Sequence, residues 1–177
     1  MSGFTLRDSQ QTDLAQIAAI YGHWVTTGLA SFELEPPDAA ELGRRRAALL
    51  AQGFPYLVAQ AAGQVLGYAY AGPYRARPAY RFACEDSIYV SPDAQGRGVG
   101  RALLAALIAR AQARDLRLMV AVIGDSANVG SIGLHRQAGF ARAGLLPSVG
   151  WKFGRWVDSV LMTRALGAGD TRPPAAG

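Results

Sequence analysis

The chain has 177 residues, of which 50% are hydrophobic and 18% are charged. That length suits a single domain with a substantial core, and that composition excludes an intrinsically disordered chain. The single cysteine, Cys84, excludes an intramolecular disulfide framework and a cysteine-based zinc site. It is typical of a reducing compartment, so we expect a cytoplasmic protein without a bound metal.

The net charge of +5 does not by itself indicate a surface for nucleic acid. The arginines are scattered, Lys152 is the only lysine, and the basic cluster at 44–46 lies in a helical pattern, where a solvated face is the simpler interpretation. No apolar run approaches the roughly 20 residues that span a bilayer, and the first residues lack the pattern of an export signal. We therefore expect neither nucleic acid nor a membrane as a partner.

Hydrophobic periodicity in the first half of the chain predicts, in order, a strand at 4–9, a helix at 12–25, a helix at 36–53 and two strands within 56–72. Thr12 or Asp13 is expected to cap the first helix, and Asp38 the second. Gly53 is expected to end the second helix, and Ala62 with Gly63 to form the turn between the strands.

The second half predicts a strand at 77–92, a glycine loop and a helix to about residue 111, a strand at 116–124, a helix at 128–139, and strands at 140–146 and 151–166. This order of strands and helices is typical of an α+β domain with a mixed sheet and a ligand at the strand ends. We expect one domain over 1–166 and a flexible tail over 167–177, whose composition is rich in glycine, alanine and proline.

The loop before the central helix carries glycines at every second position, Gly96, Gly98 and Gly100. Glycines let several main-chain N–H groups converge at a helix start, where a phosphate is favoured. Two common phosphate loops do not fit. A P-loop would continue with Lys and Ser or Thr, whereas Arg101 and Ala102 follow here, and the dinucleotide motif needs a different glycine spacing.

The string from Gln95 to Ala102 resembles the pyrophosphate loop of the GNAT superfamily of N-acetyltransferases. The downstream segment 128–140, "NVGSIGLHRQAGF", is similar to the Asn…Gly-Phe segment of that superfamily. Longer stretches, "AYAGPYRARPAYRFACEDSIYVSPDAQGRGVG" and "GWKFGRWVDSV" among them, resemble the phosphinothricin and methionine sulfoximine/sulfone N-acetyltransferase branch over nearly the whole chain.

This resemblance implies a V-splayed, largely antiparallel sheet flanked by helices, acetyl-CoA as donor, the α-amine of a small amino acid as acceptor, and a homodimer. The cofactor residues that it implies are Ile88, Val90, Gln95, Gly96, Arg97, Gly98, Val99, Gly100, Arg101, Ala102, Asn128, Ser131 and His135. The substrate residues that it implies are Phe32, Arg75, Arg77 and Tyr80. For Asn128 a role as helix cap is the alternative, and for His135 packing of its helix. For Arg75 and Arg77 the alternative is that both are solvated residues of a surface loop.

Acetyl transfer to an amine needs a base, because a free α-amine is mostly protonated near neutral pH. Glu85 matches the catalytic glutamate of the branch and is expected to take the proton directly or through water. Asp86 and Cys84 are its neighbours, and successive strand residues face opposite sides, so neither is expected to act on the same amine. Cys84 is expected in the core, which favours direct attack over a covalent acetyl-cysteine. Main-chain N–H groups near Ile88 to Val90 are expected to polarise the thioester oxygen.

Two other functions stay open. One is a CoA-binding sensor without turnover, and the other is an acetyltransferase for protein N-termini or other amines. His135 also stands where many members of the superfamily have a tyrosine that protonates the departing thiolate, so the general acid is not assigned.

Overall fold

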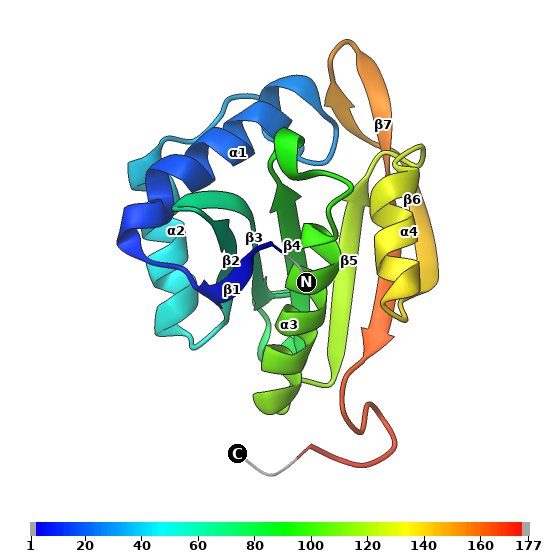
Figure 1. The fold of residues 1–177 in the computed structure, drawn as a ribbon. Helices are drawn as coiled ribbons and strands as arrows, with labels where there is room; N and C mark the ends of the chain where they lie inside the picture. The colour runs from blue at the N-terminus through cyan, green and yellow to red at the C-terminus, as the bar shows by residue number, and fades with distance from the viewer. Residues whose placement is uncertain (1–2, 175–177) are drawn as a thin grey trace.

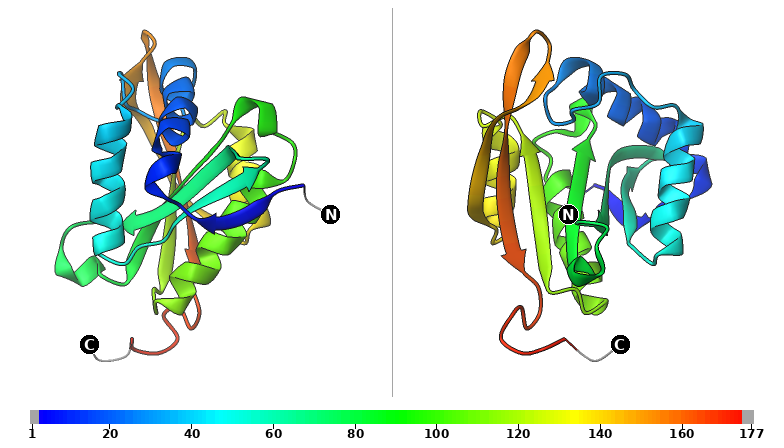
Figure 2. Two further views of the ribbon diagram at one scale, coloured as in Figure 1. Left: turned by 60° about the vertical axis from the view of Figure 1, so that its left-hand side comes forward. Right: turned by 180° about the vertical axis from the view of Figure 1, so that it is seen from behind.

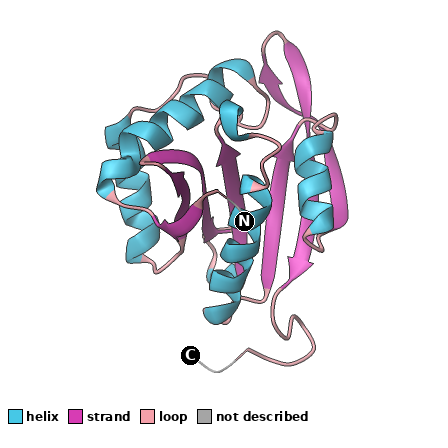
Figure 3. Cartoon of the chain, viewed as in Figure 1, coloured by secondary structure: helices cyan, strands magenta, loops and turns pink. Residues whose placement is uncertain are grey.

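The structure is a computed structural model that describes residues 3–174. It contains one seven-stranded sheet. Helices pack on this sheet, as the secondary-structure view in Figure 3 shows. The strands are β1 (Thr5–Asp8), β2 (Tyr56–Ala61), β3 (Gln64–Pro73), β4 (Ala83–Val90), β5 (Leu118–Gly124), β6 (Ala141–Lys152) and β7 (Arg155–Ala165). The helices are α1 (Leu14–Thr27), α2 (Ala39–Ala51), α3 (Val99–Ala113) and α4 (Val129–Gln137). The expected α+β architecture is confirmed.

The sheet has the order β1-β2-β3-β4-β5-β7-β6, and β4 with β5 is its one parallel pair. That pair is short, because only Ala83–Asp86 of β4 pair with Leu118–Ala121 of β5. On their outer edges, β4 stays paired with β3 up to Val90, and β5 stays paired with β7 up to Gly124. The two central strands therefore diverge beyond Asp86 and Ala121, and the sheet opens as a V (Figure 1).

The sheet has a separate apolar core on each face. On one face α3 buries its leucine-rich side against the central strands, with Leu104, Leu107, Cys84 and Met119 all inaccessible to solvent. On the other face α1 and α2 cover a cluster of tyrosines in which the rings of Tyr56, Tyr68, Tyr70 and Tyr89 stack and Tyr21 meets Tyr89 edge-on. Figure 2 shows the two helix pairs on opposite sides of the sheet.

The predicted helix ends are partly confirmed. The carboxylate of Asp38 accepts a 2.7 Å hydrogen bond from the N–H of Glu41 and caps α2, and Gly53 follows that helix with a φ of +75°. Asp13 stands at the N-cap of α1 but does not cap it with its side chain. Its carboxylate instead accepts from the N–H of Gln10 and pairs with Arg7 at 2.7 Å. An ion pair has replaced the expected cap.

Two predicted strands have different limits. The strand expected at 77–92 begins only at Ala83, because Pro78–Tyr80 form a 3-10 turn. The strand expected to end at residue 146 continues through Pro147 to Lys152, with an irregular register between Leu146 and Gly150. Proline is tolerated there because β6 is the edge strand of the sheet, where one side of the backbone needs no partner.

Beyond β7, Leu166 is buried in the core, and the residues from Ala168 to Thr171 form a turn. The expectation of a flexible tail stays a prediction, and its residues 175–177 lie outside the described part. Among the helices of residues 3–174, none is both long and apolar enough to cross a membrane.

Candidate active site

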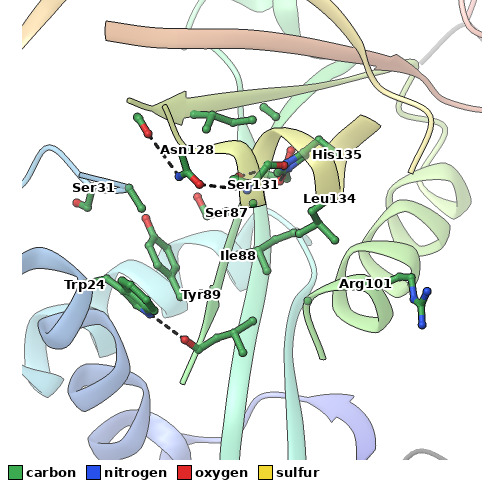
Figure 4. Close-up of a pocket in the computed structure, with 18 of the residues that line it drawn as sticks. Trp24, Ser31, Ser87, Ile88, Tyr89, Arg101, Asn128, Ser131, Leu134 and His135 are labelled. Atoms are coloured by element: carbon green, nitrogen blue, oxygen red, sulfur yellow. Dashed lines mark hydrogen bonds and ion pairs between the residues drawn. The ribbon is translucent and has the colours of Figure 1, made fainter. Parts of the chain in front are cut away.

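A cavity of about 820 Å³ opens where β4 and β5 diverge. The splayed strands, the loop and first turn of α3, the start of α4, and the segment that follows α1 line this cavity. Figure 4 shows Trp24, Ser31 and Tyr89 on one side of β4, and Ser131, Leu134 and His135 on the other. The opening therefore connects the two faces of the sheet.

The open edge of β4 presents main-chain groups to the cavity. Ser91 donates to Leu66, and Ala83 accepts from Tyr74, so odd-numbered residues of β4 direct their main-chain groups toward β3. Because successive residues alternate in this respect, Ile88 and Val90 direct theirs toward the gap. The register between β3 and β4 is continuous, so no bulge disturbs this alternation.

The carbonyl oxygen of Val90 is occupied, because it accepts a 2.8 Å hydrogen bond from the indole N–H of Trp24 on α1. The N–H of Val90 and both main-chain groups of Ile88 are left facing the gap. The same alternation applies to β5. Arg117 and Asp125, which flank this strand, bond to Leu166 and Asp158 on the side of β7, so the main-chain groups of Val122 and Gly124 face the gap from the other side.

The start of α3 is shaped for an anion. Gly96 and Gly98 have φ values of +72° and +80°, which favour glycine. A Cβ atom on Gly96 would meet no other atom within 4 Å, so no side chain covers the backbone at this position. Gly98 is the N-cap, without a side-chain cap, and the first turn of this 15-residue helix carries no acidic residue. Its N–H groups and the helix dipole are therefore available to a phosphate.

The start of α4 lies across the cavity from that loop. The side-chain oxygen of Asn128 accepts a 3.1 Å hydrogen bond from the N–H of Ser131, which confirms Asn128 as the helix cap. Its amide nitrogen lies 3.5 Å from the carbonyl oxygen of Gly124, a weak contact that leaves this donor accessible to a ligand in the cavity.

Glu85 lines the cavity at the point where the pairing of β4 with β5 ends. It is half-buried, and burial together with the nearby charge of Asp86 raises the pKa of its carboxyl group. The guanidinium of Arg75 opposes this rise. A carboxylate with a raised pKa is a better proton acceptor than an ordinary glutamate, as a general base requires.

Asp86 and His135 form a buried pair on the other face of β4. The Nε2 atom of His135 lies 2.9 Å from Oδ2 of Asp86, and the two side chains are 5% and 2% exposed. The Nδ1 atom of His135 lies 2.8 Å from the carbonyl oxygen of Ser131. Burial alone would lower the pKa of His135, but its hydrogen bond to Asp86 and the charge of that carboxylate outweigh burial and raise it. Both ring nitrogens are thus engaged with oxygen atoms.

Cys84 lies in the core, as expected. Burial, with a smaller contribution from the charge of Asp86, raises the pKa of its thiol to about 12. The thiol is therefore protonated at neutral pH and is a poor nucleophile.

Most of the predicted site residues come together around this cavity. Those that line it are Phe32, Glu85, Ile88, Val90, Gln95, Gly96, Gly98, Val99, Gly100, Arg101, Asn128, Ser131 and His135. Arg97, Ala102, Arg75, Arg77 and Tyr80 do not line it. Of these, Arg75 still lies close enough to affect Glu85, while Tyr80 packs on Tyr74 at the neighbouring loop.

Several lining residues were not predicted. Asp86 contributes because the opening reaches both faces of β4, so strand alternation does not exclude it. Trp24 lies on a helix without a motif, and Ser31, Val122 and Gly124 lie in segments where only other residues were assigned a role. A tryptophan at helical spacing gives no signal of its distant bond to Val90, and the edge of β5 is exposed only because the sheet splays.

Comparison with known proteins agrees with this geometry. The model of the Acetyltransferase (GNAT) family matches residues 17–140. The chain belongs to the GNAT family of acetyltransferases. Phosphinothricin N-acetyltransferase from Alcaligenes faecalis is 56% identical to this acetyltransferase over 170 residues, covering 96% of this chain and 86% of that protein. An L-methionine sulfoximine/L-methionine sulfone acetyltransferase from Pseudomonas paraeruginosa is 46% identical, covering 89% of this chain and 92% of the relative.

A solved relative supplies the cofactor context. The crystal structure of a phosphinothricin acetyltransferase from Sinorhizobium meliloti in complex with acetyl-CoA superposes on this acetyltransferase with a TM-score of 0.96 at 46% identity, covering 100% of this chain and 95% of that one. The bare loop of α3, the free edge of β4 and the amide of Asn128 fit a ligand with a diphosphate and an amide-containing arm. No cluster of three or more metal-ligating side chains occurs within residues 3–174.

Proposed function

We propose that this acetyltransferase transfers the acetyl group of acetyl-CoA to the α-amine of a small amino acid of the phosphinothricin, methionine sulfoximine or methionine sulfone type. The observation that carries the proposal is the position of Glu85. Its carboxylate, with a raised pKa, lines the cavity beside free main-chain N–H groups and the bare start of α3. The acceptor class rests on the names of the two relatives.

Glu85 accepts the proton that the ammonium group must lose before its nitrogen can attack, directly or through one water. Acetyl-CoA supplies an activated acetyl carbon and a thiolate as leaving group when it is bound. The new C–N bond forms as the C–S bond breaks, the electron pair of that bond leaves with the sulfur, and the second proton of the attacking nitrogen passes to solvent. The buried thiol of Cys84 takes no part, because it stays protonated.

On the donor side, the N–H groups of Ile88 and Val90 point into the gap and are placed to donate to the thioester oxygen and the amide arm. The loop from Gln95 to Ala102 holds the diphosphate through main-chain N–H groups, and Arg97 and Arg101 add positive charge. Asn128, Ser131 and His135 complete the cofactor side.

His135 is suited to stabilise negative charge and poorly suited to transfer a proton. Its Nδ1 and Nε2 atoms are committed to Ser131 and Asp86. A thiol with a pKa of about 8.5 is a tolerable leaving group without an acid, so the thiolate takes its proton from solvent.

On the acceptor side, Phe32 forms a wall of the pocket, and Arg75, Arg77 and Tyr80 belong to the adjoining loop. Guanidinium groups suit the carboxylate and the oxygen-bearing phosphorus or sulfur group of these amino acids. Arg75 is the better placed of the two arginines, since its charge already acts on Glu85.

The working unit is a homodimer in the cytoplasm. The edge strand β6 and its neighbour β7 expose large apolar side chains, including Val149, Trp151 and Trp156, and a second copy would cover them. The single cysteine fits a reducing compartment.

A thiol-release assay tests the function. Acetyl-CoA is supplied with phosphinothricin, methionine sulfoximine, methionine sulfone, ordinary amino acids, polyamines or a peptide with a free N-terminus. Release with the first three amines supports the proposal. Release with the peptide alone would favour a protein acetyltransferase, and tight acetyl-CoA binding with no release from any amine would favour a sensor.

A further inference from the structure

The segment after α1 carries Ser31 and Phe32 to the cavity and rests on strand ends that lack side chains. A Cβ atom on Gly124 of β5 would overlap the carbonyl oxygen of Leu29. A Cβ atom on Gly150 of β6 would lie only 2.6 Å from Cδ2 of the Phe32 ring. The two glycines thus provide the surface on which this segment lies.

Lys152, two residues farther along β6, fastens the same segment. Its ammonium group donates a 2.7 Å hydrogen bond to the carbonyl oxygen of Ser31. Lys152 is only 2% exposed, and burial lowers the pKa of its ammonium group, opposed by the charge of Glu33. A buried ammonium is costly, so its contact with the cavity wall is not an incidental surface pair.

A second hydrogen bond holds Ser31 from the side of α1. The hydroxyl groups of Ser31 and Tyr21 lie 2.8 Å apart, and that of Tyr21 also donates to Glu33 at 3.0 Å. Burial raises the pKa of Tyr21 to about 12, so this hydroxyl keeps its proton at neutral pH. The segment is therefore held between α1 and the hairpin of β6 and β7, which lie close to it in Figures 1 and 2.

We propose that Gly150 and Lys152 are positioning residues that set the acceptor side of the cavity by holding Phe32 and Ser31. The inference deepens the proposed function, because the acceptor wall decides which amino-acid side chains fit. The Phe32 ring lies against Gly150 of β6, lines the cavity and is 38% exposed. A side chain at residue 150 would displace the ring from β6, and we expect the displaced ring to enter the cavity and make the acceptor pocket smaller.

Gly150→Ala is the direct test. The atoms that the new methyl group would overlap are the far end of a flexible side chain, and Gly150 does not have a positive φ, so the ring moves while the fold is retained. Its kcat/KM for methionine sulfone falls by about tenfold or more, the scale of one methylene group in an apolar pocket, mainly through KM. The Kd for acetyl-CoA stays unchanged.

Gly144→Ala is the matched control, because it adds the same methyl group to the same strand with its nearest neighbour 4.0 Å away. It behaves as the wild type. Adding Phe32→Leu to Gly150→Ala restores space and recovers much of the lost kcat/KM. Lys152→Met, which keeps the length of the side chain and removes its charge, raises the amine KM and leaves the acetyl-CoA Kd unchanged.

The outcomes separate the inference from the proposed function. Wild-type enzyme that turns over no amine contradicts the proposed function. Turnover by Gly150→Ala equal to that of Gly144→Ala overturns the inference while the function stands. A crystal structure of Gly150→Ala decides the inference whatever the turnover, since an unmoved Phe32 ring would refute it.

Discussion

At the scale of single residues, the chemistry depends on Glu85, the proposed proton acceptor, and on the charges nearest to it. Arg75 opposes the rise in the pKa of Glu85, so its removal raises that pKa further. We expect Arg75→Gln to move the acid limb of the pH profile of kcat to higher pH, because Glu85 then stays protonated over a wider range. Arg81→Gln removes another exposed charge of the same loop and is expected to leave the limb in place. Equal profiles for both variants would contradict the role of Arg75.

The pair of Asp86 and His135 makes a second prediction at this scale. The pKa of His135 is raised in the folded protein, so the pair stabilises the fold fully below the unfolded value of about 6.5 and loses this contribution as pH rises through the folded pKa. Asp86→Asn should lower the titration midpoint of the His135 ring in proton NMR. The variant His23→Gln, which removes the only other histidine, assigns the signal. An unchanged midpoint in Asp86→Asn would contradict this assignment of the raised pKa to Asp86.

The sequence predicted the positions of site residues that belong to motifs and did not indicate the others. Glu85 and the glycine loop could be predicted because they lie next to each other in a recognisable string. Strand alternation correctly placed Asp86 on the face opposite Glu85, but it gave no sign that Asp86 also lines the cavity, which reaches both faces of β4. The contacts of Trp24 and Lys152 join segments 66 and 121 residues apart, and neither residue carries a local signal.

At the scale of elements, we propose that one residue of α4 contributes to both stability and cofactor binding. Asn128 caps this nine-residue helix with its oxygen atom and offers its amide nitrogen to the cavity. Asn128→Ala should cost about 0.5–2 kcal/mol of unfolding free energy and also weaken acetyl-CoA binding. Asn128→Asp keeps the cap and loses the donor, so it should weaken binding with little loss of stability. Asp38→Ala, which uncaps α2, is expected to lose stability alone.

Thermal unfolding of these three variants measures their stability, and calorimetry measures their affinity for acetyl-CoA. Full retention of affinity in Asn128→Asp would leave Asn128 with only a structural role.

Helix α4 itself was predictable from its sequence pattern, as was its cap. The late start of β4 was not predictable from the sequence, because the turn at Pro78–Tyr80 and the tertiary pairing of Ala83 with Leu118 determine where this strand begins.

At the scale of the whole molecule, the exposed face of β6 and β7 predicts self-association. Trp156 is 61% exposed and packs edge-on against Trp151 at 5.2 Å. Trp156→Glu adds a charge to this face, and desolvating it would oppose a dimer. Analytical ultracentrifugation should give twice the chain mass of 18.7 kDa for the wild type and a single chain for the variant. A monomeric wild type would contradict the dimer.

The splay of the sheet is also a property of the whole molecule, and composition and periodicity do not contain it. Resemblance to the family implied the V shape, and the register explains it, because four residues of β4 and four of β5 pair before the strands follow β3 and β7 apart. The cavity exists only through this divergence. The wall of the cavity that Ser31 and Phe32 form rests on glycines of β5 and β6, and local sequence patterns do not indicate it.

The central claim is that a cavity between splayed strands presents acetyl-CoA to an amine that Glu85 deprotonates. Thiol release by Glu85→Gln at saturating acetyl-CoA and amine tests it most directly, alongside the Kd of the variant for acetyl-CoA. We predict a loss of about 10²–10⁴-fold in kcat, the usual contribution of a general base, with an unchanged Kd. Turnover close to that of the wild type would contradict the account.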